Sequence, residues 1–262
     1  MIPVALTIAG SDPSGGAGLQ ADLKTFHQYG VYGTSVVTLL TVQNTQRVTS
    51  VEVLSSQLVI SQLDALLEDI PPTAAKTGAL GNAAVIEAVA ARAEHFSFPL
   101  VVDPVMISKH GDSLIDASAV EVLKLKLLPR AFLVTPNRQE AQRLSGCQIT
   151  DVASMEKAAA IMAEMGAANV LIKGGCIDGN RVDLLWADGR PHELAAKHIE
   201  TKHTHGTGCV LSAAITARLA SGNDLITAVT AAKKFVTAAI QSSPGLGKGI
   251  GPVLGGHARW KC

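Results

Sequence analysis

The sequence is poor in aromatic residues and has no excess of charge of either sign. Only 3% of its 262 residues are aromatic, although 47% are hydrophobic and 24 are glycine. Small side chains let helix and strand backbones approach closely, so this composition favours a sheet covered by tightly packed helices. The 22 basic residues balance 22 acidic ones, whereas binding to nucleic-acid phosphates normally needs a basic surface. No nucleic-acid partner is therefore expected.

Signals for membranes, secretion and cysteine-based scaffolds are also missing. No apolar stretch reaches the roughly 20 residues of a membrane-spanning helix. The N-terminus, Met1–Leu6, lacks the charged start and cleavage site of a secretory signal. The cysteines are far apart and form no Cys-x-x-Cys pair, which argues against a zinc site or a disulfide framework: Cys147, Cys176, Cys209 and Cys262. We expect a cytoplasmic protein with no membrane partner.

Short β-rich runs alternate with helical patterns. The runs typical of strands are Val4–Ala9, Ser35–Val42, Ala74–Lys76, Leu100–Asp103, Phe132–Thr135 and Val170–Lys173. Helical patterns cover Leu58–Asp69, Ala83–Ala93, Ala117–Leu128, Arg138–Ser145, Met155–Met165, Gly208–Ala220 and Leu225–Gln241, and Leu19, Leu23 and Phe26 share an earlier helical face. The alternation predicts an α/β fold with a mostly parallel sheet covered on both faces. Arg181–Ile199, with an Asp188-Gly189 turn, predicts a small antiparallel edge. Since no linker, repeat or low-complexity tract occurs, we predict one domain over residues 1–262.

Polar and glycine-rich clusters follow several of the predicted strands. Asp103 ends one strand, Thr135–Asn137 ends another and Lys173–Gly175 ends a third. In open parallel sheets, ligands bind beyond the carboxyl ends of the strands. One edge of the sheet is therefore expected to hold the functional site.

The first strand runs into a glycine-rich segment, Gly10–Gly18. Gly16–Ala21 matches a loose form of the dinucleotide-binding fingerprint, which also requires an acidic residue at the end of the next strand. That strand ends at Val42–Thr45 without a carboxylate, so a dinucleotide site is not expected. The glycines alone would suit a tight turn. With Asp12 and Asp22 nearby, we favour a small-molecule site.

Two carboxylates are candidates for holding magnesium. Asp103 follows a strand, where a carboxylate can bind Mg²⁺ directly or through water, although a buried turn carboxylate or helix cap is the simpler interpretation of this residue alone. Asn137 and Glu140 stand three apart at a predicted helix start, a spacing typical of capping. Capping and a supporting role at magnesium are compatible.

The most informative segment is Thr204–Cys209, which runs into an apolar helix. Its glycines let backbone N–H groups converge, and the helix N-terminus adds positive potential, so the segment predicts an anion site. Charge developing on a transferring phosphoryl group would be stabilised there. A cysteine in this first turn is expected to favour the thiolate. The competing interpretation is a glycine turn with a buried structural cysteine.

Two other features are set aside. Gly247–Gly249 contains a lysine between glycines but lacks the Walker order and a following helix. His203, His205 and His257 show no spacing typical of metal ligands.

Taken together, these motifs resemble the hydroxymethylpyrimidine/phosphomethylpyrimidine kinases of thiamine biosynthesis, within the ribokinase-like superfamily. The segments that carry the resemblance follow the family's order along almost the whole chain: Ala5–Asp12, Gly15–Phe26, Gln43–Thr45, Asp103–Met106, Thr135–Asn137, Lys173–Gly175, Thr204–Cys209 and Gly247–Pro252. The resemblance implies a ribokinase-like three-layer α/β/α fold and ATP-dependent phosphorylation of 4-amino-5-hydroxymethyl-2-methylpyrimidine and then of its monophosphate.

The resemblance also implies roles for individual residues. Gln43 would hydrogen-bond the aminopyrimidine ring, with Gly10 and Asp22 in the same pocket. The remaining roles are magnesium binding by Asp103 and Glu140, ATP binding by Asn137, Lys173 and Thr204, and an anion hole formed by Gly206, Thr207 and Gly208. Cys209 stands where most ribokinase-like enzymes have an aspartate base, and would accept or relay the proton of the substrate hydroxyl.

Two positions depart from the family pattern. Ala79 stands where many relatives have a methionine against the substrate ring, and the tail Gly255–Trp260 lacks the family's frequent paired histidines. We assign no role to that tail. Relatives that share the Gly-Cys helix start also include pyridoxal kinases, so phosphorylation of pyridoxal or pyridoxine is the closest alternative, although Gln43–Thr45 favours the pyrimidine. A non-catalytic pyrimidine-binding protein is the alternative from another class. The family also suggests a homodimer, formed through the first strands and Thr45–Val53.

Overall fold

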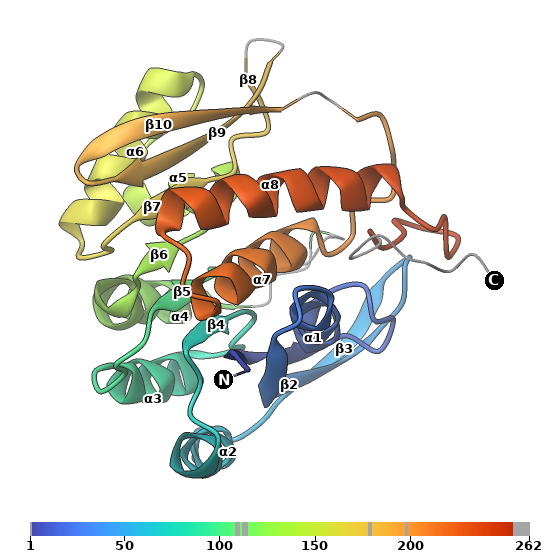
Figure 1. Cartoon of the computed structure of the whole chain (residues 1–262), viewed down its shortest axis with the longest axis vertical. Helices are drawn as coiled ribbons and strands as arrows, with labels where there is room; N and C mark the ends of the chain where they lie inside the picture. Colours follow the sequence, from blue (N-terminus) through green and yellow to red (C-terminus); the bar gives the residue numbers. More distant parts are fainter. Residues whose placement is uncertain (1, 108–110, 112–114, 178–179, 197–198, 254–262) are drawn as a thin grey trace.

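Strands and helices alternate along most of the chain (Figure 1). The computed structural model describes residues 2–107, 111, 115–177, 180–196 and 199–253. The strands are β1 (Val4–Ser11), β2 (Tyr32–Gln43), β3 (Val48–Val53), β4 (Ala74–Thr77), β5 (Leu100–Val102), β6 (Leu133–Val134), β7 (Val170–Ile172), β8 (Cys176–Ile177), β9 (Asn180–Ala187) and β10 (Arg190–Ala196). The α-helices are α1 (Gly18–Gln28), α2 (Ser56–Asp69), α3 (Ala83–Ala93), α4 (Ala117–Val122), α5 (Arg138–Ser145), α6 (Val152–Glu164), α7 (Thr207–Ala220) and α8 (Leu225–Gln241).

The strands form one sheet in the order β10-β9-β7-β6-β5-β4-β1-β2-β3, and β8 pairs with β9 beside this path. The central pairs from β7 to β2 are all parallel. Antiparallel pairs occur at both ends, where β9 joins β7 and β10, and β3 joins β2. The strands β7, β6, β5, β4, β1 and β2 all run in the same direction, so their carboxyl ends lie at one edge of the sheet.

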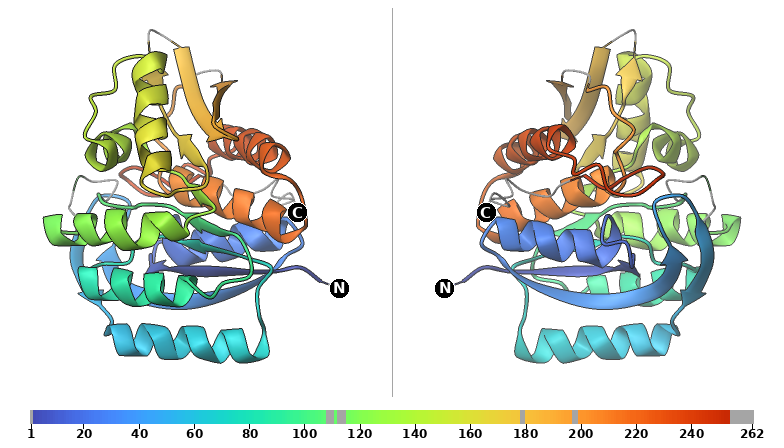
Figure 2. Two further views of the ribbon diagram at one scale, coloured as in Figure 1. Left: turned by 90° about the vertical axis from the view of Figure 1, so that its left-hand side faces the viewer. Right: turned by 90° about the vertical axis from the view of Figure 1, so that its right-hand side faces the viewer.

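Helices cover both faces of the sheet, and side chains from the strands alternate between two cores. On β5, Leu100 and Val102 pack in one core and Val101 packs in the other. The first core includes residues of α2 to α6, and the second includes residues of α1, α7 and α8. Figure 2 shows the sheet between these two helical layers. Burial on both faces explains why the central strands read as nearly continuous apolar runs.

The predicted three-layer architecture with an antiparallel edge is therefore confirmed. The bounds of α3, α5 and α8 are those expected from the sequence. The Asp188-Gly189 turn joins β9 and β10, with both residues at positive φ (52° and 72°), as a two-residue hairpin turn requires. None of the described helices is both long and apolar enough to cross a bilayer.

Three elements differ from the sequence-based expectation. Residues 48–53 form β3, a strand that alternation of polar and apolar residues did not reveal because both of its faces are largely exposed. The helix predicted over Ala117–Leu128 is α-helical only to Val122, and a π-helical turn over Leu123–Leu127 and a 3₁₀ turn over Leu128–Arg130 follow. The wider turn keeps Leu123, Leu127 and Leu128 buried together. β1 continues two residues beyond Ala9, with an irregular register at Gly10 where it passes β2.

Candidate active site

A cavity of about 680 Å³ opens at the carboxyl edge of the sheet. All twelve residues that the sequence predicted for the site line it: Gly10, Asp22, Gln43, Asp103, Asn137, Glu140, Lys173, Thr204, Gly206, Thr207, Gly208 and Cys209. They come from β1, α1, β2, α5 and α7, from the loops after β5, β6 and β7, and from the segment before α7. The expected concentration of polar groups at one sheet edge is therefore confirmed, whereas their individual roles are not tested by position alone.

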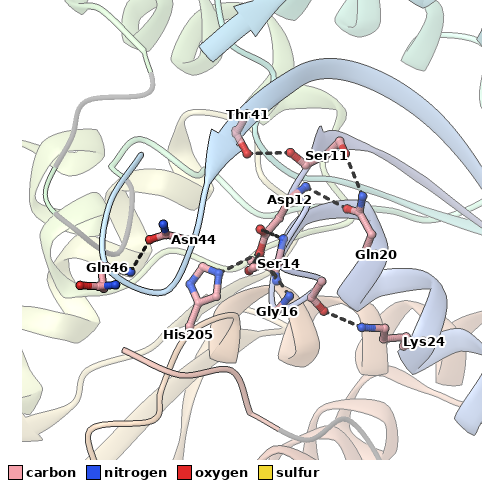
Figure 3. Close-up of polar contacts among 12 residues, drawn as sticks. Ser11, Asp12, Ser14, Gly16, Gln20, Lys24, Thr41, Asn44, Gln46 and His205 are labelled. Atoms are coloured by element: carbon pink, nitrogen blue, oxygen red, sulfur yellow. Dashed lines mark hydrogen bonds and ion pairs between the residues drawn. The ribbon is translucent and has the colours of Figure 1, made fainter. Parts of the chain in front are cut away.

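The Asp12 carboxylate organises the glycine-rich loop between β1 and α1 (Figure 3). It is 2% exposed and accepts hydrogen bonds from the backbone N–H groups of Ser14 (2.8 Å), Gly16 (3.2 Å) and Ala17 (2.8 Å). His205 Nε2, from the segment before α7, lies 2.8 Å from the same carboxylate. Asp12 therefore links the loop to the start of the predicted anion hole.

Burial on its own raises the pKa of Asp12, but hydrogen bonds with His205, Gln43 and Ser14 outweigh that effect and hold it well below its usual value. The carboxylate is therefore ionised at neutral pH. Sequence reasoning used Asp12 as support for a small-molecule site but did not reveal its partner His205, which is 193 positions away.

Two glycines allow close backbone contacts at the starts of α7 and α1. At Gly206, which has φ 78°, a Cβ atom would overlap the carbonyl oxygen of Gly16. At Gly18, which has φ 57°, a Cβ atom would overlap the carbonyl oxygen of Gly10. Positive φ and lack of space both require glycine at these positions. The N-termini of α1 and α7 consequently meet at the cavity.

A buried ion pair forms the floor of the cavity. Lys76 Nζ lies 2.8 Å from Asp22 Oδ1, and both side chains are fully buried. Thr7 Oγ1 donates to the other carboxylate oxygen at 2.6 Å. Burial alone lowers the pKa of Lys76, but Asp22 outweighs it and raises the pKa, so the lysine is charged. The Asp22 carboxylate, which was expected to face the substrate, thus also forms an ion pair with Lys76 and a hydrogen bond with Thr7.

A second charged cluster lies at the ends of β5 and β7. Asp103 Oδ1 is 3.2 Å from Lys173 Nζ, and Asp103 Oδ2 accepts a hydrogen bond from Ser212 Oγ of α7 at 3.1 Å. Burial lowers the pKa of Lys173, but Asp103 and Glu140 raise it by more. A Cβ atom at Gly208 would lie 3.2 Å from Lys173 Nζ and 3.8 Å from Asp103 Oδ2. The absent side chain of Gly208 therefore lets this cluster border the N-terminus of α7.

Glu140 completes a capping box at the start of α5, as its spacing from Asn137 predicted. Its carboxylate accepts from the Asn137 backbone N–H at 2.8 Å, and the Asn137 side chain accepts from the Glu140 N–H at 2.9 Å. Burial, with repulsion from Asp103, raises the pKa of Glu140 to about 7 despite the attraction of Lys173. Desolvation is the main obstacle to ionisation of Glu140, and the attraction of Lys173 offsets it only in part.

These carboxylates fit the oxygen-ligand preference of magnesium. Asp103 and Glu140 would hold a divalent cation, and Mg²⁺ in phosphoryl-transfer sites commonly takes only one or two carboxylates besides phosphates and water. Among the described residues, no three His, Cys, Asp or Glu side chains form a metal-binding group. His257 lies outside the described residues, as does the tail Gly255–Trp260.

The first turn of α7 has Gly206 as its N-cap, and no side chain of the described residues caps it. Its backbone N–H groups are therefore available to an anion. Thr207 Oγ1 donates to the Thr204 carbonyl oxygen at 2.8 Å. The expectation of a favoured thiolate at Cys209 is wrong, however. Burial raises the pKa of Cys209 to about 12, and Lys76 and the Gly18 backbone N–H offset that rise only in part. A helix N-terminus favours a thiolate only as far as desolvation permits.

β2 forms another wall of the cavity. Its inward face brings Leu39, Thr41 and Gln43 to the lining, while Leu40 and Val42 point outward and are 49% and 61% exposed. Beyond Gln43, Thr45 is held by the segment near the C-terminus: its Oγ1 accepts from the Gly249 N–H at 3.2 Å and its carbonyl from the Ile250 N–H at 2.8 Å. The glycines of Gly247–Pro252 thus pack against the Gln43–Thr45 segment and not around a phosphate.

Sequence reasoning missed three polar residues of the cavity. Lys76 followed a predicted strand but gave no sign of its partner, since Asp22 is 54 positions away. Lys233 and Asp183 form an ion pair of 2.6 Å that also lines the cavity. The helical spacing of Lys233 with Val236, Thr237 and Ile240, all of which face the cavity, is the one signal that could have pointed to this wall.

Comparison with known proteins agrees with the motif resemblance. The family profile described as phosphomethylpyrimidine kinase matches residues 12–254. The hydroxymethylpyrimidine/phosphomethylpyrimidine kinase of Synechococcus elongatus is 48% identical over 98% of this chain and 97% of its own, and that of Rhizobium meliloti is 47% identical over both full lengths.

Solved structures give the same fold. The Bacillus subtilis pyridoxal kinase, solved as an ADP complex, has a TM-score of 0.90 at 37% identity over 97% of this chain and 98% of its own. The Clostridium difficile phosphomethylpyrimidine kinase has a TM-score of 0.82 at 41% identity over 91% and 99%. The fold is therefore the ribokinase-like one expected.

The contact between Gly206 and Gly16 predicts a local effect of Gly206→Ala. The added methyl group overlaps the Gly16 carbonyl, so the first turn of α7 must shift, and we expect kcat to fall by about 100-fold or more, as when a backbone oxyanion donor is lost. Gly222→Ala is the matched control, since Gly222 has φ 81° with nothing within 4 Å. It should cost about 1–2 kcal/mol of stability through φ alone and leave kcat within about twofold. Steady-state kinetics and urea unfolding measure both, and equal kcat values for the two variants would contradict the steric explanation.

The raised pKa of Cys209 predicts slow alkylation. With a pKa of about 12, roughly one thiol in 10⁴ is ionised at pH 8, whereas about a quarter of ordinary thiols are. The rate with iodoacetamide should rise about tenfold per pH unit between pH 8 and 10, because the thiolate fraction does. Peptide mapping by mass spectrometry measures the alkylation rate of Cys209, and the partly exposed Cys147 in the same sample gives the rate for comparison. Half-maximal reactivity near pH 7 would show a thiolate already formed.

Proposed function

The chain belongs to the phosphomethylpyrimidine kinase family, and we propose that its cavity carries out the two phosphorylations for which its relatives are named. The resemblance drawn from the sequence motifs is thereby confirmed. The enzyme transfers the terminal phosphate of ATP to 4-amino-5-hydroxymethyl-2-methylpyrimidine and then to the monophosphate, giving the pyrophosphate of thiamine biosynthesis. A relative that is 48% identical, and about half of which this chain covers, is named a bifunctional thiamine biosynthesis protein.

One observation carries this function: the wall formed by β2 and the N-terminus of α7 line the same cavity. Gln43 stands on the wall formed by β2, and the first turn of α7, with Asp103 and Lys173 beside it, stands across from the glycine-rich loop. A hydroxymethyl group on a ring held at Gln43 would point toward a phosphate held at α7. Positioning of this kind supplies most of the catalysis in phosphoryl transfer.

The reaction is an in-line displacement. The substrate hydroxyl oxygen forms a bond to the γ-phosphorus, the bond from that phosphorus to the bridging oxygen breaks, and ADP leaves with the bonding electrons. The N–H groups of Gly206, Thr207 and Gly208 would form the anion hole, and together with the charge of Lys173 they would stabilise the negative phosphoryl oxygens. Asn137 and Thr204 contact the nucleotide. Asp103 and Glu140 would hold Mg²⁺, which neutralises phosphate charge when bound.

Cys209 handles the hydroxyl proton as a relay. A protonated thiol cannot take up a proton without releasing one, so the sulfur accepts the proton of the substrate hydroxyl while its own proton passes to a phosphoryl oxygen. This order leaves the thiol unchanged after each turnover. It does not require the thiolate, which burial disfavours.

Pyridoxal kinase activity is the second candidate. The similarity of fold to pyridoxal kinases from Bacillus subtilis and Staphylococcus aureus, at TM-scores of 0.90, supports testing it, whereas the curated relatives support the pyrimidine.

The kinase assignment predicts ATP-dependent turnover of the hydroxymethylpyrimidine, with kcat/KM above that for pyridoxal. A coupled assay of ADP release with both alcohols measures this preference, and mass spectrometry detects the mono- and diphosphorylated pyrimidine.

Cys209→Ala should lower kcat by about 100-fold, as expected for loss of a proton-transferring group. Cys209→Ser, whose hydroxyl can relay a proton, should lose less. Turnover by Cys209→Ala at the wild-type rate would refute the relay, and ATP consumption with neither alcohol would favour a non-catalytic pyrimidine-binding protein.

We also propose that the chain is one kinase domain over residues 1–262, works in the cytoplasm where ATP is supplied, and forms a homodimer through β2 and β3. The dimer is supported by the end of β2, where Leu40 and Val42 point outward and are 49% and 61% exposed, and by β3 at the end of the sheet. Neighbouring apolar side chains of this size favour a covered surface.

The dimer predicts a molar mass by light scattering of twice that of one chain. Val42→Lys places a charge on the outward face and should shift the protein toward the monomer without touching the cavity lining. Glu68→Lys, on α2, is the control for added charge and should leave the mass unchanged. A wild-type mass of one chain would contradict the dimer.

A further inference from the structure

The two carboxylate oxygens of Asp103 have different surroundings. Asp103 directly follows β5 and is buried. Its Oδ1 atom lies 3.2 Å from Lys173 Nζ and accepts a hydrogen bond from Thr135 Oγ1 at the longer distance of 3.4 Å. Its Oδ2 atom accepts a hydrogen bond from Ser212 Oγ, on α7, at 3.1 Å. Side chains from three other parts of the fold therefore hold this carboxylate.

These contacts determine which acceptor position of the carboxylate remains. Each oxygen of an ionised carboxylate offers about two lone pairs. Among the residues that the structure describes, Lys173 and Thr135 occupy both positions on Oδ1, whereas Ser212 occupies one position on Oδ2. Oδ2 therefore keeps one position for a cation or for the water of a hydrated cation. This oxygen also borders the first turn of α7, since a Cβ atom at Gly208 would lie 3.8 Å from it.

Ser212 lies one helical turn beyond Gly208, on the same face of α7. Its side chain is fully buried, and its Oγ also lies 3.1 Å from the Cys209 carbonyl oxygen. A serine inside a helix commonly bonds to such a carbonyl of the preceding turn. A hydroxyl has only one proton to donate, and a hydrogen bond to an ionised carboxylate is the stronger one. The proton of Ser212 is therefore directed to Asp103.

Thr216 provides a comparison one further turn along α7. It is as fully buried as Ser212, and its Oγ1 donates to the Ser212 carbonyl oxygen at 2.8 Å. That hydrogen bond stays within the helix. The two hydroxyls thus share a helix and a degree of burial, but the hydroxyl of Ser212 reaches a carboxylate expected to bind magnesium.

We propose that Ser212 is a positioning residue for magnesium, because its hydroxyl holds Asp103 with one acceptor position of Oδ2 left beside the N-terminus of α7. This inference deepens the proposed function and rests on it, since it takes Asp103 as a magnesium ligand. Groups that orient a metal ligand commonly change metal affinity by about 10–100-fold when they are removed. Loss of the Ser212 hydroxyl should therefore weaken binding of the cation and leave binding of the pyrimidine unchanged.

The test measures binding of Mn²⁺, used in place of Mg²⁺, to the enzyme with ADP and without an alcohol, so that no turnover occurs. Free Mn²⁺ gives an EPR signal that is lost when the ion binds. Ser212→Ala should weaken Mn²⁺ binding by about tenfold or more, with KM for the pyrimidine within about twofold of wild type. Thr216→Val is the matched control and should keep the wild-type Mn²⁺ affinity. Equal Mn²⁺ affinities for the two variants, or a wild type that binds no Mn²⁺, would overturn the proposal.

A double variant shows whether Ser212 acts through Asp103. In protein that carries Asp103→Asn, adding Ser212→Ala should change Mn²⁺ affinity by less than about twofold, because the charged oxygen that Ser212 positions is already absent. A further tenfold loss, flagged as roughly the effect expected in the wild-type background, would contradict action through Asp103. Ser212→Thr, which retains a hydroxyl, should recover most of the affinity lost in Ser212→Ala. A folded Ser212→Thr variant that binds Mn²⁺ as weakly as Ser212→Ala would also overturn the proposal.

Ser212→Cys answers the same question should Ser212→Ala fail to fold, because a thiol is a weak hydrogen-bond donor. It should bind Mn²⁺ more weakly than Thr216→Val does, and equal affinity would overturn the proposal. Isothermal titration with ADP in the absence of metal separates positioning from general loosening of the fold. A loosened fold would weaken metal-free ADP binding as much as Mn²⁺ binding, and that result would refute a specific role of Ser212.

Failure of this inference and failure of the proposed function give different results. Wild type that phosphorylates the pyrimidine, with Mn²⁺ affinities that are equal in Ser212→Ala and Thr216→Val, refutes only the role of Ser212. Wild type that binds Mn²⁺ with ADP but phosphorylates neither alcohol refutes the proposed function, and the Mn²⁺ affinities of the variants still decide the role of Ser212.

Discussion

The ion pair between Lys76 and Asp22 is the constraint on which the cavity depends. Neither charge touches solvent, and a single buried charge left without its partner is strongly unfavourable. β4, which carries Lys76, and α1, which carries Asp22, can therefore be placed in only one way relative to each other and to Thr7 on β1. That placement brings the start of α1 to the carboxyl edge of the sheet, where Gly18 donates to the thiol of Cys209. A pair of this kind contributes more to specifying the site than to net stability.

The rest of the cavity combines close backbone contact with a surplus of fixed charge. Glycine at position 206 leaves room for the Gly16 carbonyl of the loop, and glycine at position 18 leaves room for the Gly10 carbonyl of β1. Two helix N-termini therefore converge, and neither has a side-chain cap. Around them stand four buried carboxylates, Asp12, Asp22, Asp103 and Glu140, and two lysines, of which Lys76 is fully buried and Lys173 is 17% exposed. Burial is the main cause of the high pKa of Glu140. Such a site is prepared for a polyanion that arrives together with a cation. Mg²⁺ and ATP meet that description, and neither alone would balance both halves of the site.

Local sequence patterns were sufficient for features that are themselves local. The capping spacing of Asn137 and Glu140, the glycines before Cys209 and the apolar runs of the central strands all predicted structure correctly because the relevant partners lie within a few residues or within one element. The partners of Lys76 and Asp12 were not recognised because they are 54 and 193 positions away, and no pattern within one segment reports them. The thiolate expected at Cys209 was wrong for the same reason: the helix start is a local feature, whereas the desolvation that opposes it is produced by the whole fold. β3 was missed because neither of its faces is buried, so its sequence carries no strand periodicity.

Division of the cavity into a phosphoryl half and a ring half reconciles the two kinds of relative. The phosphoryl half consists of the α7 N-terminus with Asp103, Lys173 and Glu140, and these groups contact one another and not Gln43. Any alcohol presented to this half in the right place meets the same charges, which is consistent with a common fold for pyridoxal and pyrimidine kinases. Discrimination between substrates must then arise at the ring half, where Gln43 lines the cavity and the segment 249–253 holds Thr45. A change of substrate within this fold therefore requires alteration of a few contacts in the ring half, while the catalytic charges stay as they are.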